Sequence, residues 1–266
     1  MSHLTPAELE IIIVCATFAV GYTAYYSVSH SARVHAWFAA RSERDRSETL
    51  RTLVHRMVMV VGFGVVPAVL LGAFGPRSLA DYGLVLVWNT RQAAVTAGLS
   101  VVVVAVIRFN PGRSKLTGMY PQMRIESWRL RHVAANALGW SAYLLAYELM
   151  FRGFLLHALL PYGVVVALSV NTLLYVAVHV PKGLSEAIAA VPFGILVCYL
   201  SLQFGTIWPA FFLHLTLALA NSFVAIAGNP RMRIEWRKRR SAIAPSGRSD
   251  EPSAEAASEA APATDA

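Results

Sequence analysis

The sequence predicts an all-α fold, a polytopic bundle of about seven transmembrane helices. Hydrophobic residues make up 56% of the 266 residues and charged residues only 14%, whereas a soluble domain carries about 25% charged residues. The mean hydropathy is +0.51, and apolar residues run along the chain to about residue 228. These observations indicate one membrane domain with a polar tail, and a lipid bilayer as its surroundings.

Seven apolar stretches approach the roughly 20 residues that a spanning helix needs. They are Ile11–Val28, Met57–Gly75, Gln92–Ile107, Val133–Leu160, Tyr162–Val180, Leu184–Phe204 and Thr206–Gly228. The segment before the first stretch has two acids and no Lys or Arg, which favours a retained helix over a signal peptide. The third stretch is short. The helix could extend into the preceding apolar run Tyr82–Trp88, although Asn89-Thr90-Arg91 separates the two. The last four have very short links, which predicts an antiparallel bundle.

The basic residues predict the orientation, because loops rich in Lys and Arg stay in the cytoplasm. Three segments carry most of them: Arg33, Arg41, Arg44, Arg46, Arg51 and Arg56; Arg108, Arg113, Lys115, Arg124, Arg129 and Arg131; and Arg231, Arg233, Arg237, Lys238, Arg239 and Arg240. With seven spans these segments share one side, so we expect the N-terminus outside the cell membrane and the C-terminus in the cytoplasm. The net charge of +8 then suits an anionic membrane surface, and we expect no nucleic-acid partner.

Four polar residues inside the apolar stretches are candidates for a functional site. Glu148 and Arg152 are four residues apart in the fourth stretch and therefore share one helix face. His179 and His214 lie in the fifth and seventh stretches. A charge at the bilayer centre costs about 2.5–3.5 kcal/mol, so such residues pair or line a cavity. An intrahelical ion pair and two helix–helix hydrogen bonds are the structural alternative to a site.

The same residue types can perform hydrolysis. A glutamate and a histidine can together deprotonate a water molecule. Glu148, His179 and His214 could also hold a divalent metal such as zinc. Asn221 follows His214 by seven residues, on nearly the same helix face, where it could stabilise an oxyanion or serve as an ordinary interhelical amide.

A second pair of opposite charges lies at the start of the sixth stretch. Lys182 and Glu186 are four residues apart. We expect them to form a surface ion pair that caps this helix.

Three runs of sequence carry a resemblance to a known family. They are YELMFRGFLLHAL, NTLLYVAVH and PFGILVCYLSLQFGTIWPAFFLH, in that order. Together they resemble the CPBP family, which comprises type II CAAX prenyl proteases and bacterial Abi-type bacteriocin-processing or immunity proteins. The resemblance covers roughly residues 133–225, and the first three apolar stretches show no such match.

The resemblance implies a role for each candidate residue. The second glutamate and the arginine of the family's E-E-x-x-x-R motif correspond to Glu148 and Arg152. Its F-x-x-x-H motif corresponds to Tyr175 and His179, and its H-x-x-x-N motif begins at His214. The implied activity is that of an intramembrane endopeptidase acting on a membrane-held peptide or protein. The family has been discussed both as metalloproteases and as glutamate–histidine enzymes.

Two positions depart from the family's pattern. Tyr147 replaces the first glutamate, and Ala218 stands where the asparagine is expected, with Asn221 three residues later. In an active enzyme Glu148 would then take the role of the base. The alternative is a catalytically inactive protein of the same fold that acts as an immunity factor or scaffold.

The chain accordingly divides into three predicted regions. Residues 1–130 hold N-terminal membrane helices and basic cytoplasmic loops, and residues 131–228 form the CPBP-like catalytic helix core. Residues 229–266 form a cytoplasmic tail that is first basic and then, over 241–266, rich in Ala, Ser, Pro, Asp and Glu. Such a composition predicts disorder.

Overall fold

A computed structural model of the chain describes residues 4–109 and 118–235. Within these ranges the protein is all-α apart from two three-residue strands, β1 and β2, which pair in parallel. The elements are α1 Pro6–His30, α2 Ala32–Ala39, α3 Arg44–Met59, η1 Val60–Val65, α4 Val66–Phe74, α5 Thr90–Phe109, β1 Ser127–Arg129, α7 Leu130–Glu148, η2 Leu149–Leu155, α8 Leu156–Leu159, η3 Leu160–Tyr162, α9 Val164–Ala177, η4 Val180–Lys182, α10 Leu184–Phe204, α11 Trp208–Gly228 and β2 Arg233–Glu235. The segments η1 and η2 are π-helical, and η3 and η4 are 3₁₀ turns.

The prediction of about seven spanning helices is confirmed. Seven described helices are long and apolar enough to cross a membrane. They are Pro6–His30, Arg44–Phe74, Thr90–Phe109, Leu130–Tyr162, Val164–Lys182, Leu184–Phe204 and Trp208–Gly228. The residues predicted to form the tail lie outside the described residues from position 236 onward, as do Arg113 and Lys115.

The polar triplet Asn89-Thr90-Arg91 begins the third span. The Asn89 side chain accepts a hydrogen bond from the backbone N–H of Gln92 over 2.8 Å, as a residue that caps a helix N-terminus does. The helix is continuous from Thr90 to Phe109. It therefore does not extend into Tyr82–Trp88, which is not helical.

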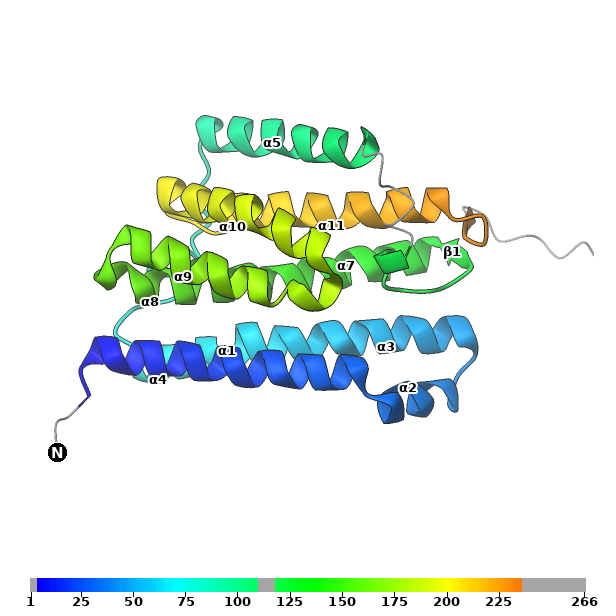
Figure 1. Ribbon diagram of the computed structural model, residues 1–266, viewed down its shortest axis with the longest axis horizontal. Coiled ribbons are helices and arrows are strands. Elements are labelled where there is room, and N and C mark those ends of the chain that lie inside the picture. Colours follow the sequence, from blue (N-terminus) through cyan, green and yellow to red (C-terminus); the bar gives the residue numbers. More distant parts are fainter. Residues whose placement is uncertain (1–3, 110–117, 236–266) are drawn as a thin grey trace, which may run out of the picture. The chain divides into compact units, whose positions relative to one another are not determined.

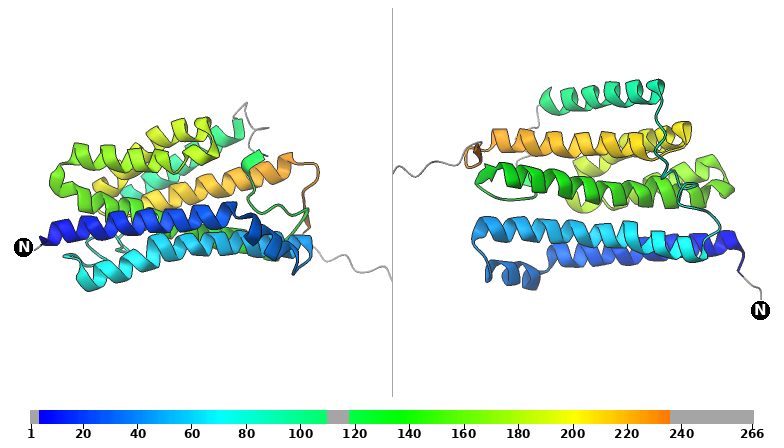
Figure 2. Two further views of the ribbon diagram at one scale, coloured as in Figure 1. Left: turned by 60° about the horizontal axis from the view of Figure 1, so that its bottom comes forward. Right: turned by 180° about the vertical axis from the view of Figure 1, so that it is seen from behind.

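The spans pack around a central helix. The continuous helix made of α7, η2 and α8 lies between α1 with α3 and α4 on one side and α9, α10 and α11 on the other (Figure 1; Figure 2). It is by far the most buried span. The outermost helix, α5, packs on α11. Polar residues of the central helix are therefore shielded from lipid by neighbours on both sides.

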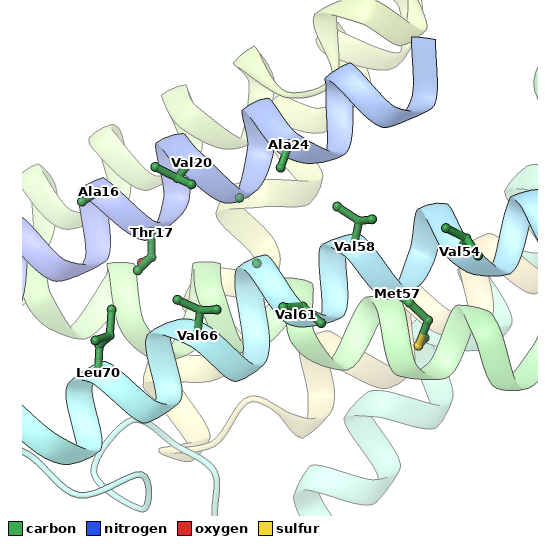
Figure 3. Close-up of a pocket in the computed structure, with 12 residues that line it drawn as sticks. Ala16, Thr17, Val20, Ala24, Val54, Met57, Val58, Val61, Val66 and Leu70 are labelled. Atoms are coloured by element: carbon green, nitrogen blue, oxygen red, sulfur yellow. The ribbon is translucent and has the colours of Figure 1, made fainter. Parts of the chain in front are cut away.

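Two glycines bring α1 against η1. A Cβ atom at Gly21 would lie 2.9 Å from the carbonyl oxygen of Gly62, and one at Gly62 would lie 2.8 Å from the Cα of Gly21. Small residues allow such backbone contact between membrane helices. Beside this crossing lies an apolar groove of about 680 Å³, lined by side chains such as Val20 and Val61 that are largely exposed and suit lipid (Figure 3).

Part of the first predicted basic link belongs to the second span. Arg56 is only 2% exposed, lies 4.2 Å over the Trp140 ring and donates to the backbone and side-chain oxygens of Asn136 over 2.9 and 3.0 Å. Its assignment to a cytoplasmic loop was wrong, because its polar partners lie on α7 rather than in water.

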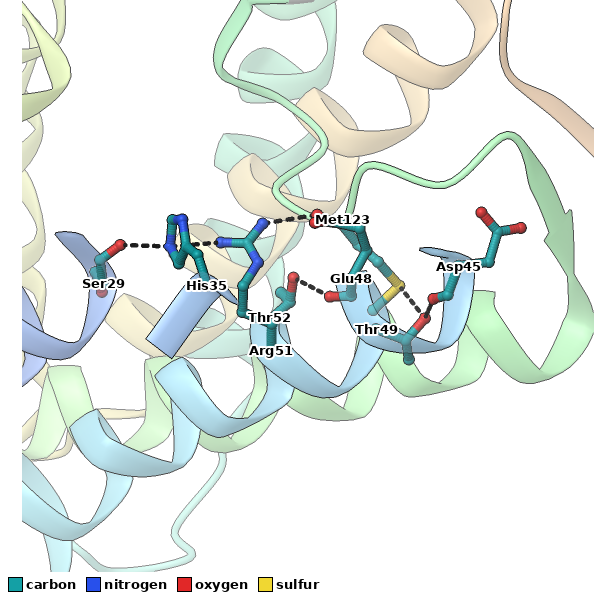
Figure 4. Close-up of polar contacts among 8 residues, drawn as sticks. All are labelled: Ser29, His35, Asp45, Glu48, Thr49, Arg51, Thr52 and Met123. Carbon is teal, nitrogen blue, oxygen red and sulfur yellow. Dashed lines mark hydrogen bonds and ion pairs between the residues drawn. The ribbon is translucent and has the colours of Figure 1, made fainter. Parts of the chain in front are cut away.

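Ion pairs and hydrogen bonds also tie the start of this span to its neighbours. Arg51 contacts Glu48 over 2.6 Å and His35 over 3.3 Å, and the Thr49 hydroxyl reaches the Met123 sulfur at 3.6 Å (Figure 4). These contacts join α2, α3 and the segment before β1.

Candidate active site

Glu148 and Arg152 form an ion pair at the centre of the bundle. Glu148 ends α7, and Arg152 lies in the π-helical segment η2; such segments are frequent at functional sites. The Arg152 Nε atom is 3.2 Å from Glu148 Oε2, and both side chains are fully buried. The guanidinium also lies 4.4 Å over the Tyr175 ring. The predicted pairing on one helix face is therefore present in the structure.

His214 joins this pair from α11. Its Nδ1 atom lies 2.5 Å from Glu148 Oε1. An ionised carboxylate can only accept, so Nδ1 carries the proton and donates it to the hydrogen bond. Nε2 is then the ring nitrogen that points away from the carboxylate. A carboxylate on one nitrogen fixes both the tautomer and the orientation of the ring.

His179 approaches the same region from the end of α9. Its Nδ1 atom lies 2.6 Å from the backbone carbonyl of Tyr175. Because a carbonyl can only accept, the neutral imidazole carries its proton on Nδ1 and leaves Nε2 as an acceptor. The Tyr147 ring contacts both imidazoles, with centroids 5.5 Å from His214 and 6.5 Å from His179.

The two imidazoles share a small cavity. It has a volume of about 20 Å³, and a cavity of roughly 10–15 Å³ can hold one water molecule. The lining residues are Tyr120, Trp140, Tyr143, Tyr147, His179, Lys182, Glu186, His214, Leu217 and Ala218. Glu148 and Arg152 are not among them, so they lie behind His214 rather than on the cavity wall.

A larger, mainly apolar cleft adjoins this water-sized cavity. It measures about 260 Å³ and shares His179, Glu186 and Leu217 with the smaller space. The other lining residues are Val102, Val103, Val106, Ile107, Tyr175, Ala189, Ala190, Phe193 and Asn221. An apolar group of a ligand in this cleft would therefore lie beside the polar residues of the smaller cavity.

Asn221 belongs to the cleft and not to the water-sized cavity. Its amide is hydrogen bonded to the Tyr120 side chain. Burial raises the pKa of Tyr120 above its ordinary value, the charge of Glu186 adds to this, and the bond from Asn221 opposes it. Ala218, one turn earlier on α11, lines the small cavity with a methyl group. The structure thus separates Asn221 from the cavity that His214 faces.

Lys182 and Glu186 are the polar residues that sequence reasoning misassigned. They were predicted to form a surface ion pair, but both are partly buried and line the water-sized cavity. No ion pair joins them among the described residues. The spacing was visible in the sequence, but it could not show that the turn before α10 folds toward His214.

The predicted metal ligands do not fit a metal ion. No group of three or more His, Cys, Asp or Glu residues in 4–109 and 118–235 is arranged to hold one. The carboxylate of Glu148 faces Arg152 and His214 with its two oxygens. His179 uses its Nδ1 atom on a backbone carbonyl. The zinc prediction therefore has no support in this geometry.

Comparison with known proteins finds one family match, over the segment that holds these residues. The family model described as "Type II CAAX prenyl endopeptidase Rce1-like" matches residues 130–220. The match supports membership of the CPBP family for residues 130–220. The matched segment is about a third of the chain and contains Glu148, Arg152, His179 and His214, so the CPBP domain coincides with the central helix and the helices that face it. Together with the seven apolar helices, this match supports a multi-pass membrane protein.

One predicted site residue, Asn221, lies outside the matched segment. The match ends one residue before Asn221. No curated protein and no solved structure gave a match. Roles for individual residues of this CPBP domain therefore rest on the geometry described above.

Proposed function

We propose that this chain is an intramembrane endopeptidase of the CAAX-protease or bacteriocin-processing type, which hydrolyses a membrane-held peptide or protein. One observation carries the proposal. His214 is held by Glu148 through Nδ1 and lines a cavity of about 20 Å³ that has room for one water molecule. An acid that orients an imidazole next to a water site is an arrangement suited to acyl hydrolysis.

The proposed reaction starts from water in this cavity. Nε2 of His214 takes one proton while the water oxygen attacks the scissile carbonyl carbon. Glu148 stabilises the resulting imidazolium, and Arg152 keeps Glu148 ionised. His214 then donates the same proton to the leaving nitrogen as the C–N bond breaks. Glu148 thus acts on water through His214, whereas the sequence alone suggested a direct role as base.

The water also needs an acceptor for its second O–H group. His179 and Glu186 line the same cavity, and the Nε2 atom of the one and the carboxylate of the other would supply two. With both hydrogens directed at acceptors, a lone pair of the water faces the substrate. Buried waters make about three hydrogen bonds, which this wall can provide.

The larger cleft suits the substrate. Its apolar wall from α5 and α10 would hold a side chain or a lipid group, and Asn221 would bind the substrate backbone. In Figure 1, α7 and α11 continue toward β1 beyond the turn that joins α9 to α10. With the N-terminus outside and the C-terminus in the cytoplasm, water and substrate would reach the site from the cytoplasmic side.

The experiment compares membrane-protein fragments, by mass spectrometry of new termini, in cells that carry the native chain or Glu148→Gln. We expect fragments that depend on the native chain and are lost in Glu148→Gln. The matched control is Glu10→Gln, since Glu10 is also a buried membrane carboxylate but binds Arg77 and Tyr82 over 2.8 Å. It should keep the fragments at equal protein level.

An identical set of fragments for the native chain and Glu148→Gln would contradict the proposal. The chain would then be the inactive CPBP-fold protein, acting as an immunity factor or scaffold. Proteolysis that arises only on restoring a glutamate with Tyr147→Glu would point to the same conclusion. Purified native chain in liposomes, tested with an internally quenched peptide that ends in a prenylated CAAX sequence, would show whether a prenyl group is recognised.

A further inference from the structure

Tyr147 has a buried hydroxyl group that nothing in the described part of the chain satisfies. The residue is 3% exposed, and its hydroxyl oxygen has no hydrogen-bond partner among the described residues. A buried polar group without a partner costs about 1–3 kcal/mol, so each such group needs an explanation. Tyr147 also lines the water-sized cavity. The side chain that carries this hydroxyl therefore borders the space that a water molecule or substrate atom would occupy.

The surroundings hold the Tyr147 ring in one place. It packs at 4.7 Å from the Phe151 ring and at 5.8 Å from the Tyr143 ring, with which it is stacked. It meets the His214 ring edge-on at an interplanar angle of 83° and the His179 ring at 88°. The hydroxyl consequently has a fixed position relative to both imidazoles, as a preorganised hydrogen-bond donor requires.

The proposed reaction needs a donor at this point. The cavity wall offers the Trp140 N–H, the Lys182 ammonium and the Tyr147 hydroxyl, and of these side chains only Tyr147 has a ring contact with both imidazoles among the described residues. When water attacks the scissile carbonyl carbon, the carbonyl oxygen becomes an oxyanion that needs a hydrogen-bond donor. Ala218 provides only a methyl group on the cavity wall, and Asn221 does not line this cavity. Both His179 and His214 present an acceptor nitrogen before proton transfer. The phenol of tyrosine, whose ordinary pKa is about 10, can donate at neutral pH.

We propose that the Tyr147 hydroxyl donates a hydrogen bond to the oxyanion of the tetrahedral intermediate. The inference rests on the proposed peptidase function and adds a catalytic residue to it. No proton leaves Tyr147: the new C–O bond pushes the carbonyl π electrons onto oxygen, and the water proton goes to His214. When the C=O bond forms again, the C–N bond breaks and the nitrogen takes that proton. Tyr147 thus replaces the missing first glutamate with a donor rather than a base.

The test is Tyr147→Phe, which removes the hydroxyl and little else. Kinetics use the internally quenched prenylated CAAX peptide or, if the native chain does not cut it, a peptide spanning a cleavage site found in cells. We expect kcat to fall about 10²–10³-fold with KM within about threefold. Affinity for a phosphonate analogue of the same peptide, whose oxygens mimic the oxyanion, should fall in parallel. Because the hydroxyl has no protein partner, the melting temperature should not fall.

Tyr82→Phe is the matched control. Tyr82 is also a buried tyrosine of the bundle, but its hydroxyl is bonded to Glu10 over 2.8 Å and it lines neither the cavity nor the cleft. Its kcat should stay within about threefold of the native value. An equally active Tyr147→Phe overturns the inference and leaves the peptidase proposal intact. A melting temperature that falls by several degrees in Tyr147→Phe also overturns it, since the hydroxyl would then have a structural partner. A native chain that cleaves nothing ends the peptidase proposal itself.

Discussion

Removal of the Arg152 charge should strongly destabilise the fold. Arg152 and Glu148 are fully buried, with 3.2 Å between Nε and Oε2. The contact is Coulombic rather than a well-aligned hydrogen bond, because Arg152 Nε and Glu148 Oε2 have no hydrogen-bond partner among the described residues. Arg152→Met fills a similar volume but leaves Glu148 with only His214 as a partner. Breaking a buried ion pair from one side costs about 3–5 kcal/mol.

The cost should depend on the charge that is left behind. For a chain of this size each kcal/mol shifts the melting temperature by about 2–4 °C, so Arg152→Met should melt about 6–20 °C lower. The double variant Arg152→Met with Glu148→Gln has no buried charge at either position. It should recover most of the lost stability without recovering any peptidase activity.

The measurement is thermal unfolding of the purified variants in detergent, followed by tryptophan fluorescence. Three chains are compared with the native one: Arg152→Met, Glu148→Gln and the double variant. A double variant as unstable as Arg152→Met would refute the reasoning. The cost would then come from lost packing of Arg152 against Tyr175, at 4.4 Å, and not from an unpaired carboxylate.

Two further predictions concern the helix crossing and the metal. Gly62→Ala should destabilise the protein by about 1–3 kcal/mol, because its Cβ would meet the Gly21 backbone at 2.8 Å. The control is Gly72→Ala, whose Cβ has nothing within 4 Å. Equal melting temperatures of the two variants would contradict this prediction. Dialysis of the active protein against a strong chelator should leave the cleavage rate unchanged, since the described residues offer no three-ligand group. A loss of rate that zinc restores would contradict it.

The fold was predictable because its signals are local and repeated. Seven long apolar stretches with few charges require helices, since every backbone polar group in lipid must be satisfied within the segment. The third span shows where this reasoning reached its limit. Asn89 looked like an interruption, but its side chain caps the helix that follows. Arg56 shows another limit, because a basic residue near a predicted loop can bury its charge against an aromatic ring and an amide on another helix.

The candidate site was predictable only in part, because sequence spacing describes one helix at a time. The pairing of Glu148 with Arg152 follows from their spacing of four residues. That His214 reaches Glu148 depends on how α11 packs on α7, and no pattern within either helix contains that information. Sequence spacing also could not show that Glu186 lines a cavity with residues of other helices, so it was predicted to lie on the surface.

On the proposed role of Tyr147, a departure from the family's motif need not mean a loss of chemistry. By sequence alone, a tyrosine in place of a glutamate removes a base, and an alanine at position 218 removes a donor. In three dimensions both positions face one cavity of about 20 Å³, so a group on α7 can supply what α11 lacks. On the proposed role of Tyr147, the two substitutions compensate each other, since the small side chain at 218 leaves space beside the phenol at 147. Restoring asparagine at 218 while Tyr147 is present should therefore crowd the cavity rather than improve it.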